Sequence, residues 1–355
     1  RSKNYQNLAE LPGDPFFDRV LIGEYSPGSP FKILTGLIGL QEEVIDTHTS
    51  FSCGHGFYYA RGAFMKCHDA GTWSLNSAIR LSCNTYFAQT YKKIIDKYQN
   101  PRLGMDAWYN HLKSFGLGSF LGYDLPIGRK GQIPNSEYYD RWYPKGGWKG
   151  TTTISNAIGQ GEITVTPIQL ANVMCAVANQ GFYHTPHIIK SIENDKIDKN
   201  FVEKKVTTID RQHFLPVIEG LAEVYRSGTA SRLQIPDINI CGKTGTVENF
   251  IKVDGKKVQL KDHSVFLAFA PKEDPKIVIA VFIENGGFGA TIAGPIASLM
   301  IQKYLSGTIT RTDLEKRMLE SSLHSEYVLK DQVEAEKKLK LKLEKELAKN
   351  RNKKK

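Results

Sequence analysis

A serine and a lysine that share one helical face are the first residues in this sequence whose spacing could do chemistry. Ser29 and Lys32 stand in the stretch YSPGSPFK, residues 25–32, and a separation of three places both side chains on one side of a helix. The lysine amine could accept the proton of the serine hydroxyl if burial or a neighbouring cation lowers its pKa. The flanking prolines and Gly28 restrict the backbone around the serine. The stretch therefore predicts a serine nucleophile with a lysine general base.

Two further short motifs could complete such a site. One is an S-x-N motif at residues 82–84, and the other is K-T-G-T at residues 243–246. Gly245 on a strand would allow a substrate backbone to lie close to the strand edge. Lys243 could be a second cation that keeps Lys32 neutral. Each motif arises often by chance, and it is their occurrence together in this order that indicates one site.

The elements that must position these motifs follow from apolar periodicity. Helices are predicted from Ser29 onward, on either side of Ser82, and over residues 103–118, 167–181, 214–228 and 293–307. Strands are predicted late in the chain, over residues 238–249, 264–271 and 276–287. Residues 1–24 are mixed in character, and within them LPGDPFFDR, residues 11–19, is predicted to be irregular. Residues 51–72 are predicted to form a loop or short hairpin. Helices in the middle and antiparallel strands late predict an α+β fold.

The motifs and their surroundings resemble the class B penicillin-binding proteins over nearly all of residues 5–310. The segments YSPGSPFK, SCNTYF, AIGQGEITVTPIQLANVMCAVANQG, GKTGTVEN, DHSVFLAFAP and IENGG are similar to the penicillin-binding protein 2 branch, the transpeptidase of cell elongation. The resemblance implies the fold shared with serine β-lactamases, an antiparallel sheet with helices on both sides. It implies a transpeptidase domain at 1–312, truncated at its N-terminus, and a charged helical or disordered tail at 313–355.

The resemblance also implies a role for each motif residue. Ser29 would be the acyl nucleophile, Lys32 would be its general base, and Ser82 would relay protons. Asn84 would hydrogen-bond the substrate peptide, and Lys243 would set the local electrostatic field. Substrate would bind along the strand at Thr244, Gly245 and Thr246. Backbone amides of Ser29 and Thr246 would form the oxyanion hole. The predicted reaction attacks the D-Ala–D-Ala bond of a peptidoglycan stem peptide and transfers the acyl group to a neighbouring amine, with no cofactor required. β-Lactams would acylate the same serine.

The family is anchored in the inner membrane, with a pedestal domain and a periplasmic catalytic domain. This sequence begins with Arg1, and we expect a fragment without the anchor, the pedestal and the first strands of the domain. By resemblance, the partner is a membrane glycan polymerase of the rod-shape machinery. A β-lactam sensor, a division-septum transpeptidase and a D,D-carboxypeptidase stay open as alternatives. Chain length and the GQGEITVTPIQ segment argue against a β-lactamase.

Cysteine and histidine lie close together between the first two motifs. Cys53 and Cys67 could bind Zn²⁺ with His55 or His68, could form a disulfide, or could remain plain thiols. Some penicillin-binding protein 2 relatives carry a metal in this part of the domain, with Asp among the ligands, and this sequence does not clearly match that set. Cys83, inside the S-x-N motif, is predicted to be a small buried packing residue.

The charge distribution argues against nucleic acid as a partner. The formal net charge is +10, but residues 331–355 hold ten Lys/Arg and five Asp/Glu, so half of the excess lies in the last segment. The remaining 330 residues are only weakly basic. The basic tail could touch an anionic lipid or polymer, or could be a solvated extension. His263 is predicted to be a structural histidine, because the three motifs already supply the proton carriers.

Overall fold

The computed structural model describes residues 2–143, 147–193 and 195–353. Three antiparallel strands in the order β5-β8-β9 form the main sheet. These strands are β5 (Cys241–Val247), β8 (His263–Ala270) and β9 (Ile277–Ile283). Thr244 is paired with Phe266, and Phe266 with Val281. Strand β5, which carries the K-T-G-T motif, lies at the edge of this sheet.

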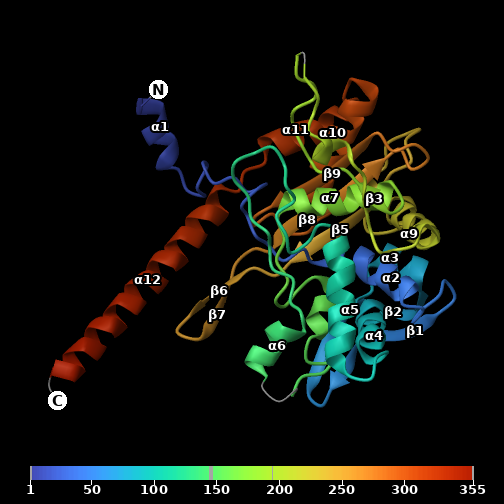
Figure 1. Ribbon diagram of the computed structural model, residues 1–355. Coiled ribbons are helices and arrows are strands. Elements are labelled where there is room, and N and C mark those ends of the chain that lie inside the picture. The colour runs from blue at the N-terminus through green and yellow to red at the C-terminus, as the bar shows by residue number, and fades with distance from the viewer. Residues whose placement is uncertain (1, 144–146, 194, 354–355) are drawn as a thin grey trace.

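Helices cover both faces of the sheet, as predicted (Figure 1). Helix α10 (Ala293–Ser306) packs on β8 and β9, and α7 (Pro167–Ala178) packs on the same two strands from the other side. Helix α9 (Phe214–Arg226) contacts β5. The chain is therefore an α+β protein whose sheet is buried between helical layers.

A helical lobe beside the sheet carries the first two motifs. Its members are α2 (Lys32–Gln41), α3 (Leu75–Leu81), α4 (Asn84–Asp96), α5 (Pro101–Ser114) and α6 (Ser136–Trp142), with 3₁₀ turns at Ser29–Phe31 and Ile154–Ile158. All residues of α2 from Lys32 to Leu40 are buried. A helix that is apolar around its whole circumference belongs in a core, and this one forms the centre of the lobe.

The segment predicted as a loop or short hairpin is a long β-hairpin instead. Strands β1 (Ser50–Ala60) and β2 (Ala63–Ser74) pair antiparallel, with irregularities in register near Gly54 and Tyr58. The prediction was wrong in extent because four glycines interrupt the alternation that marks a strand. The hairpin lies against α4 and brings its cysteines behind the S-x-N motif.

Two small strand pairs and several short helical segments lie elsewhere in the described chain. They are β3 (Phe182–Tyr183) with β4 (Lys205–Val206), β6 (Phe250–Val253) with β7 (Lys256–Gln259), α8 (Lys199–Val202), and 3₁₀ turns at Arg211–His213 and Ser231–Leu233. The N-terminal segment begins with α1 (Ser2–Ala9), and residues 11–19, predicted to be irregular, contain neither helix nor strand. The described side chains of that helix are exposed. The helix therefore has no buried apolar face that a sequence pattern could indicate.

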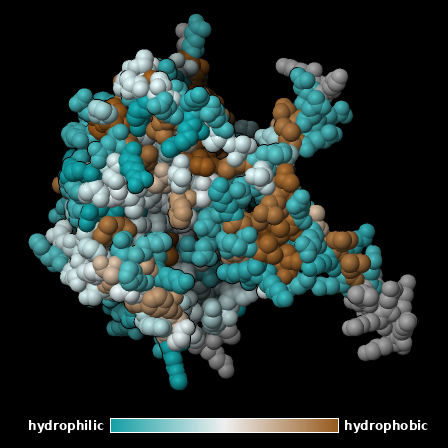
Figure 2. All heavy atoms as spheres, turned by 180° about the vertical axis from the view of Figure 1, so that it is seen from behind, coloured by the Kyte–Doolittle hydropathy of each residue, from teal (hydrophilic) through white to brown (hydrophobic). Residues whose placement is uncertain are grey.

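The C-terminal segment forms α11 (Thr312–Glu320) and α12 (His324–Lys353). Helix α12 contacts β6 near its start and projects from the body, on the side where α1 also lies (Figure 1). Seen from behind, apolar surface gathers on this side (Figure 2). None of the helices in the described ranges combines the length and apolar character that crossing a membrane requires.

Candidate active site

Lys32 is carried into the interior by the helix that it begins. The turn Ser29–Phe31 leads directly into α2, and the Lys32 side chain is 1% exposed. Burial lowers the pKa of Lys32 to about 8, because an ammonium loses its hydration in the core. The sequence suggested two causes for a lowered pKa of Lys32, burial and a neighbouring cation. In the structure, burial is the cause that lowers it.

Four oxygen atoms surround the Lys32 amine. Nζ donates to the carbonyl oxygen of Ser82 and to Oδ1 of Asn84, both at 2.6 Å. It also lies 3.1 Å from Oγ of Ser29 and 3.1 Å from Oγ of Ser82. A neutral amine has two N–H donors and one lone pair. The two pure acceptors can take both N–H groups, which leaves the lone pair for a hydroxyl.

Ser82 reaches Lys32 because the helix breaks there. It closes α3 in the left-handed conformation with φ of 60°, and α4 starts two residues later at Asn84. Helix was predicted on both sides of Ser82, and the structure has this arrangement. Asn84 is held from the other side, since its Nδ2 donates to the carbonyl oxygen of Lys66 at 2.8 Å.

Lys243 is the second buried lysine of the site. It lies on β5 with no exposed surface, and its Nζ donates to the carbonyl oxygen of Thr244 at 3.3 Å. Burial first, and then the charge of Lys32, lower the pKa of Lys243 well below its ordinary value. That Lys243 is the second cation of the site stays a prediction. Desolvation of Lys32 itself accounts for the lowered pKa of that residue.

The glycine of K-T-G packs against the turn that holds the nucleophile. A Cβ on Gly245 would lie 2.6 Å from Cδ of Pro30, and a Cβ on Gly289 would lie 2.5 Å from the carbonyl oxygen of Gly245. The missing side chain of Gly245 therefore lets β5 meet the 3₁₀ turn that contains Ser29. Close approach of substrate to this strand stays a prediction.

The three motifs open onto one cleft of about 910 Å³. Its lining includes Ser29, Ser82, Asn84, Thr244, Gly245 and Thr246. Thr229 also lines it, and its Oγ1 lies 2.7 Å from Oγ1 of Thr244. Sequence reasoning missed Thr229, because no motif marks it. A buried lysine, two serine hydroxyls and an edge strand in one cleft are suited to acyl transfer to a serine.

Comparison with known proteins places this cleft in a family. The model of the penicillin binding protein transpeptidase domain matches residues 1–302. The chain belongs to this family. Among curated relatives, peptidoglycan D,D-transpeptidase MrdA of Acinetobacter baumannii is 31% identical over 82% of this chain and 44% of its own length. MrdA of Haemophilus influenzae is 28% identical over 88% of this chain and 49% of its own. The chain spans about half the length of these relatives.

Solved structures agree with the family. The crystal structure of Pseudomonas aeruginosa PBP2 in complex with WCK 5153 is 27% identical, with a TM-score of 0.73, covering 88% of this chain and 69% of the other. A structure described as a peptidoglycan synthase complex that coordinates polymerization and crosslinking is 26% identical, with a TM-score of 0.72, covering 87% and 51%. The predicted family and the predicted transpeptidase fold are confirmed.

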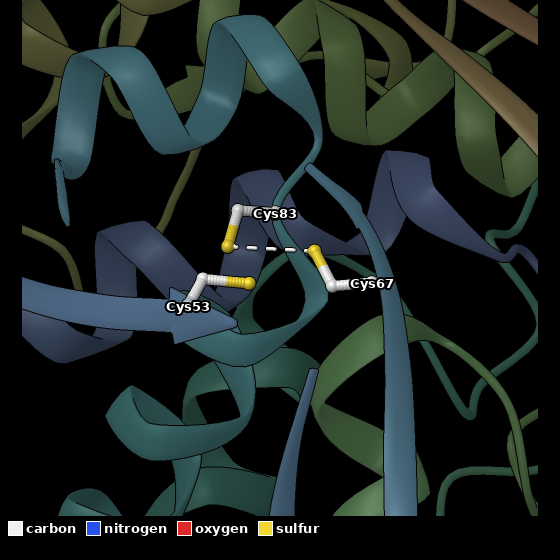
Figure 3. A group of neighbouring side chains, drawn as sticks. All are labelled: Cys53, Cys67 and Cys83. Carbon is white, nitrogen blue, oxygen red and sulfur yellow. Dashed lines mark hydrogen bonds between the residues drawn. The ribbon is translucent and has the colours of Figure 1, made fainter. Parts of the chain in front are cut away.

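Behind the S-x-N motif of this transpeptidase domain lie three free cysteines (Figure 3). The sulfur atoms of Cys53, Cys67 and Cys83 are all within 4.8 Å of one another. Sγ of Cys67 is 3.6 Å from Sγ of Cys83 and accepts a hydrogen bond from the backbone N–H of Asn84 at 3.3 Å. The hydrogen bond with Cys83 lowers the pKa of the Cys67 thiol below its ordinary value. Cys83, predicted to be a packing residue, is buried but also faces the other two thiols.

The predicted ligand set is therefore corrected in its histidines. His55 and His68 are outside the group of neighbouring donor atoms found in the described chain. Nδ1 of His55 instead lies 3.1 Å from the carbonyl oxygen of His68. The cysteines of the prediction do meet, and Cys83 is the third member. Three thiolates are a donor set that suits Zn²⁺ and other thiophilic ions, so the residues present fit a metal.

Proposed function

We propose that this chain is the catalytic part of a peptidoglycan D,D-transpeptidase. The observation that carries the proposal is the surroundings of Lys32. Its amine has two strong acceptors at 2.6 Å and two serine hydroxyls at 3.1 Å, in a fully buried position behind Ser29 and Ser82, which line the cleft. A lysine with a pKa of about 8 is a competent general base near neutral pH.

The reaction begins when Lys32 takes the proton of Ser29 and Oγ attacks the carbonyl carbon between the two terminal D-alanines. The tetrahedral oxyanion would be bound by the backbone amides of Ser29 and Thr246. Collapse breaks the C–N bond, and D-alanine leaves as an amine after receiving a proton through Ser82 or Lys32. An acyl ester on Ser29 remains.

The second step reverses these proton transfers. The amine of a neighbouring stem peptide attacks the ester carbonyl and loses a proton to the Ser82–Lys32 pair. The ester C–O bond breaks, Ser29 recovers its hydrogen, and a new amide joins the two stems. Asn84 would orient the donor peptide, while Thr244 and Thr246 would bind its terminal carboxylate. A β-lactam would enter the first step and remain as an ester, since the three motifs supply no deacylating carboxylate.

We propose an elongation role, exercised at the periplasmic side of the inner membrane with a membrane glycan polymerase as partner. The support is the identity with curated relatives named MrdA and with a solved PBP2. The match to a structure in which polymerization and crosslinking are coordinated supports the partner. On the periplasmic side of the inner membrane, the enzyme would meet its substrate class, the stem peptides of peptidoglycan.

Intact-mass spectrometry after incubation with benzylpenicillin tests the site. We expect a stable adduct on the wild type and on Ser26→Ala, a matched control in the same segment, and none on Ser29→Ala. An adduct that disappears within seconds would indicate a β-lactamase. Absence of any adduct from folded wild type would overturn the proposal. A pentapeptide donor with a D-amino acid acceptor then separates transpeptidation from release of D-alanine to water.

We also propose that Cys53, Cys67 and Cys83 bind one thiophilic metal ion, such as Zn²⁺, as a structural brace behind the S-x-N motif. The support is the group of three sulfur atoms at mutual distances below 4.8 Å. When bound, the ion would hold β1, β2 and the start of α4 together. Metal content by native mass spectrometry and Co²⁺ thiolate absorption should be lost in Cys67→Ser. They should persist in Cys175→Ser on α7, and equal metal content in both variants would refute the site.

A further inference from the structure

Glu284, the residue that follows β9, lies between the segment that precedes the nucleophile and the C-terminal helix. Its side chain is largely buried and accepts a hydrogen bond from the Tyr25 hydroxyl at 2.7 Å. It also pairs with Nε of Arg19 at 3.1 Å and accepts from the Tyr327 hydroxyl at 3.2 Å. None of these four residues belongs to the three motifs. Tyr327 lies on α12, beyond the residues that the family model matches.

Tyr25 is fixed on three sides only four residues before Ser29. Its backbone pairs with Val165 through two hydrogen bonds of 2.9 and 2.8 Å. Its ring stacks on Phe282 with centroids 4.0 Å apart, and its hydroxyl donates a hydrogen bond to the Glu284 carboxylate. From Tyr25 the chain runs through buried Pro27 to Gly28, whose N–H donates to the carbonyl oxygen of Gly159 at 2.9 Å. A shift of Tyr25 is therefore passed to the serine through a short, stiff connection.

Glu284 is also the first residue of the loop that covers β5, the strand with the K-T-G-T motif. The loop continues from Glu284 to Gly289, where a Cβ would meet the backbone of Gly245. It is held on the way, because Oγ of Ser264 donates to the carbonyl oxygen of Phe288 at 3.0 Å. Glu284 thus connects the two backbone segments that meet at the nucleophile, one carrying Ser29 and the other facing β5.

Helix α12 closes this network from outside. The Tyr327 ring packs on Gly13, where a Cβ would lie 2.8 Å from the ring, and the guanidinium of Arg19 lies 5.9 Å from its centroid. Lower on the same helix, Val333 is buried with Val253 and Leu260 of the β6–β7 region. The start of α12 is therefore part of the folded body, although its later turns project from it (Figure 1).

We propose that Glu284 is a positioning residue for Ser29 and that Tyr327 of α12 completes its anchor, so that the C-terminal helix supports acylation from outside the family domain. The proposal rests on the proposed function, because its effect is on the step that forms the acyl ester. A serine displaced by a fraction of an ångström loses its alignment with Lys32 and with bound substrate, while binding at Thr244 and Thr246 is little affected.

Stopped-flow acylation by a fluorescent penicillin separates the limiting acylation rate from the apparent dissociation constant. We expect Glu284→Leu to lower the limiting rate by roughly ten- to a hundredfold, Tyr25→Phe by about tenfold and Tyr327→Phe by about two- to fivefold, with the dissociation constant nearly unchanged. Glu284→Gln keeps an oxygen that accepts from Tyr25 and should retain most of the rate. Tyr304→Phe, an exposed tyrosine on α10, is the matched control and should behave as wild type.

The outcomes separate the two proposals. Wild type that is not acylated at all would overturn the proposed function itself. Wild type that is acylated, with Tyr25→Phe and Tyr327→Phe equally fast, would overturn only the positioning role. Loss of binding and rate together with a lowered melting temperature would also overturn it, because that result marks a purely structural network. A rate lost in Glu284→Leu and restored in Glu284→Gln, at unchanged melting temperature, would support it.

Discussion

At the scale of single residues, the protonation state of Lys32 decides whether the site can activate Ser29. A protonated Lys32 has no lone pair and cannot take the Ser29 proton, whereas the neutral amine can. Burial brings the pKa of Lys32 down to about 8, so both forms are accessible near neutral pH. Ordinary lysine would keep its proton through this range. The lowered pKa follows from the position of Lys32 in the first turn of a wholly buried helix.

The rate of acylation should rise with pH and level off. Below a pKa of about 8 for Lys32, the neutral fraction increases about tenfold for each pH unit, and above it the fraction approaches one. We expect the second-order rate constant of benzylpenicillin acylation to increase between pH 6 and 8 and to be flat above pH 9. Stopped-flow measurement over this range checks the curve. A rate that falls as the pH rises from 6 to 8 would contradict the role of Lys32 as base.

Asn84→Asp should move this curve to higher pH. The amide oxygen of Asn84 lies 2.6 Å from Nζ of Lys32, and a carboxylate there would stabilise the ammonium. The pKa of Lys32 should then rise by roughly one to three units, and the midpoint of the acylation profile should rise with it. At pH 7 the variant should be about ten- to a thousandfold slower, and part of the rate should return at pH 10. An unchanged midpoint would show that Asn84 does not set the charge of Lys32.

At the scale of elements, the site depends on close packing between the nucleophile turn and β5. Gly28 has φ of 62° and ψ of −150°, and a Cβ there would lie 2.8 Å from Cγ2 of Val247. A side chain is disfavoured by the backbone conformation and by the neighbouring strand at once. The glycine before Ser29 is thus required by two separate physical constraints.

Gly28→Ala should therefore lose acylation as well as stability. The matched control is Gly62→Ala in the β1–β2 turn, with φ of 75° and no atom within 4 Å of the new Cβ. Both variants bear the strain of positive φ, but only Gly28→Ala also brings a Cβ against Val247 and pushes the turn away from β5. We expect a larger decrease in melting temperature in Gly28→Ala than in Gly62→Ala, and a much slower acylation in Gly28→Ala alone. Equal acylation rates in the two variants would argue against tight packing at this turn.

Sequence alone predicted the elements that have an apolar core face and missed those without one. The helices at α2, α7, α9 and α10 were predicted from their apolar periodicity, and the strands β5, β8 and β9 from a composition and apolar runs that are typical of buried strands. The β6–β7 hairpin was missed although Asp254–Gly255 is a turn signal between two short strands. Helix α1 offers no comparable signal.

The candidate site likewise contains residues that the sequence predicted and residues that it missed. The three motifs predicted the residues that meet in the cleft, since motif order carries information about a known chemistry. The meeting of Cys83 with Cys53 and Cys67 depends on how the irregular hairpin packs behind α4, which no spacing along the chain specifies. Thr229 and Glu284 act through tertiary contacts with Thr244 and Tyr25, so their importance becomes visible only in the folded chain.

At the scale of the whole molecule, the C-terminal helix is attached through a core of its own. Val253, Leu260 and Val333 form a small buried cluster that is separate from the main core. Lys340 pairs with Asp254 at 2.9 Å and extends the contact along α12. Small satellite cores of this kind open at lower free energy than the domain that carries them. The junction between α12 and the β6–β7 hairpin should therefore unfold locally.

Val333→Asp should release α12 while the transpeptidase core remains folded. A carboxylate in place of a buried valine has no partner in the cluster and costs several kcal/mol, more than so small a core can offset. Hydrogen–deuterium exchange should increase at residues 250–260 and at the start of α12, with the exchange of β8 and β9 unchanged. Leu343→Asp, on the exposed part of the same helix, is the matched control and should leave exchange at the hairpin as in wild type. Protection of residues 250–260 that survives in Val333→Asp would show that the hairpin is held by the sheet alone, and that α12 is not the element that stabilises it.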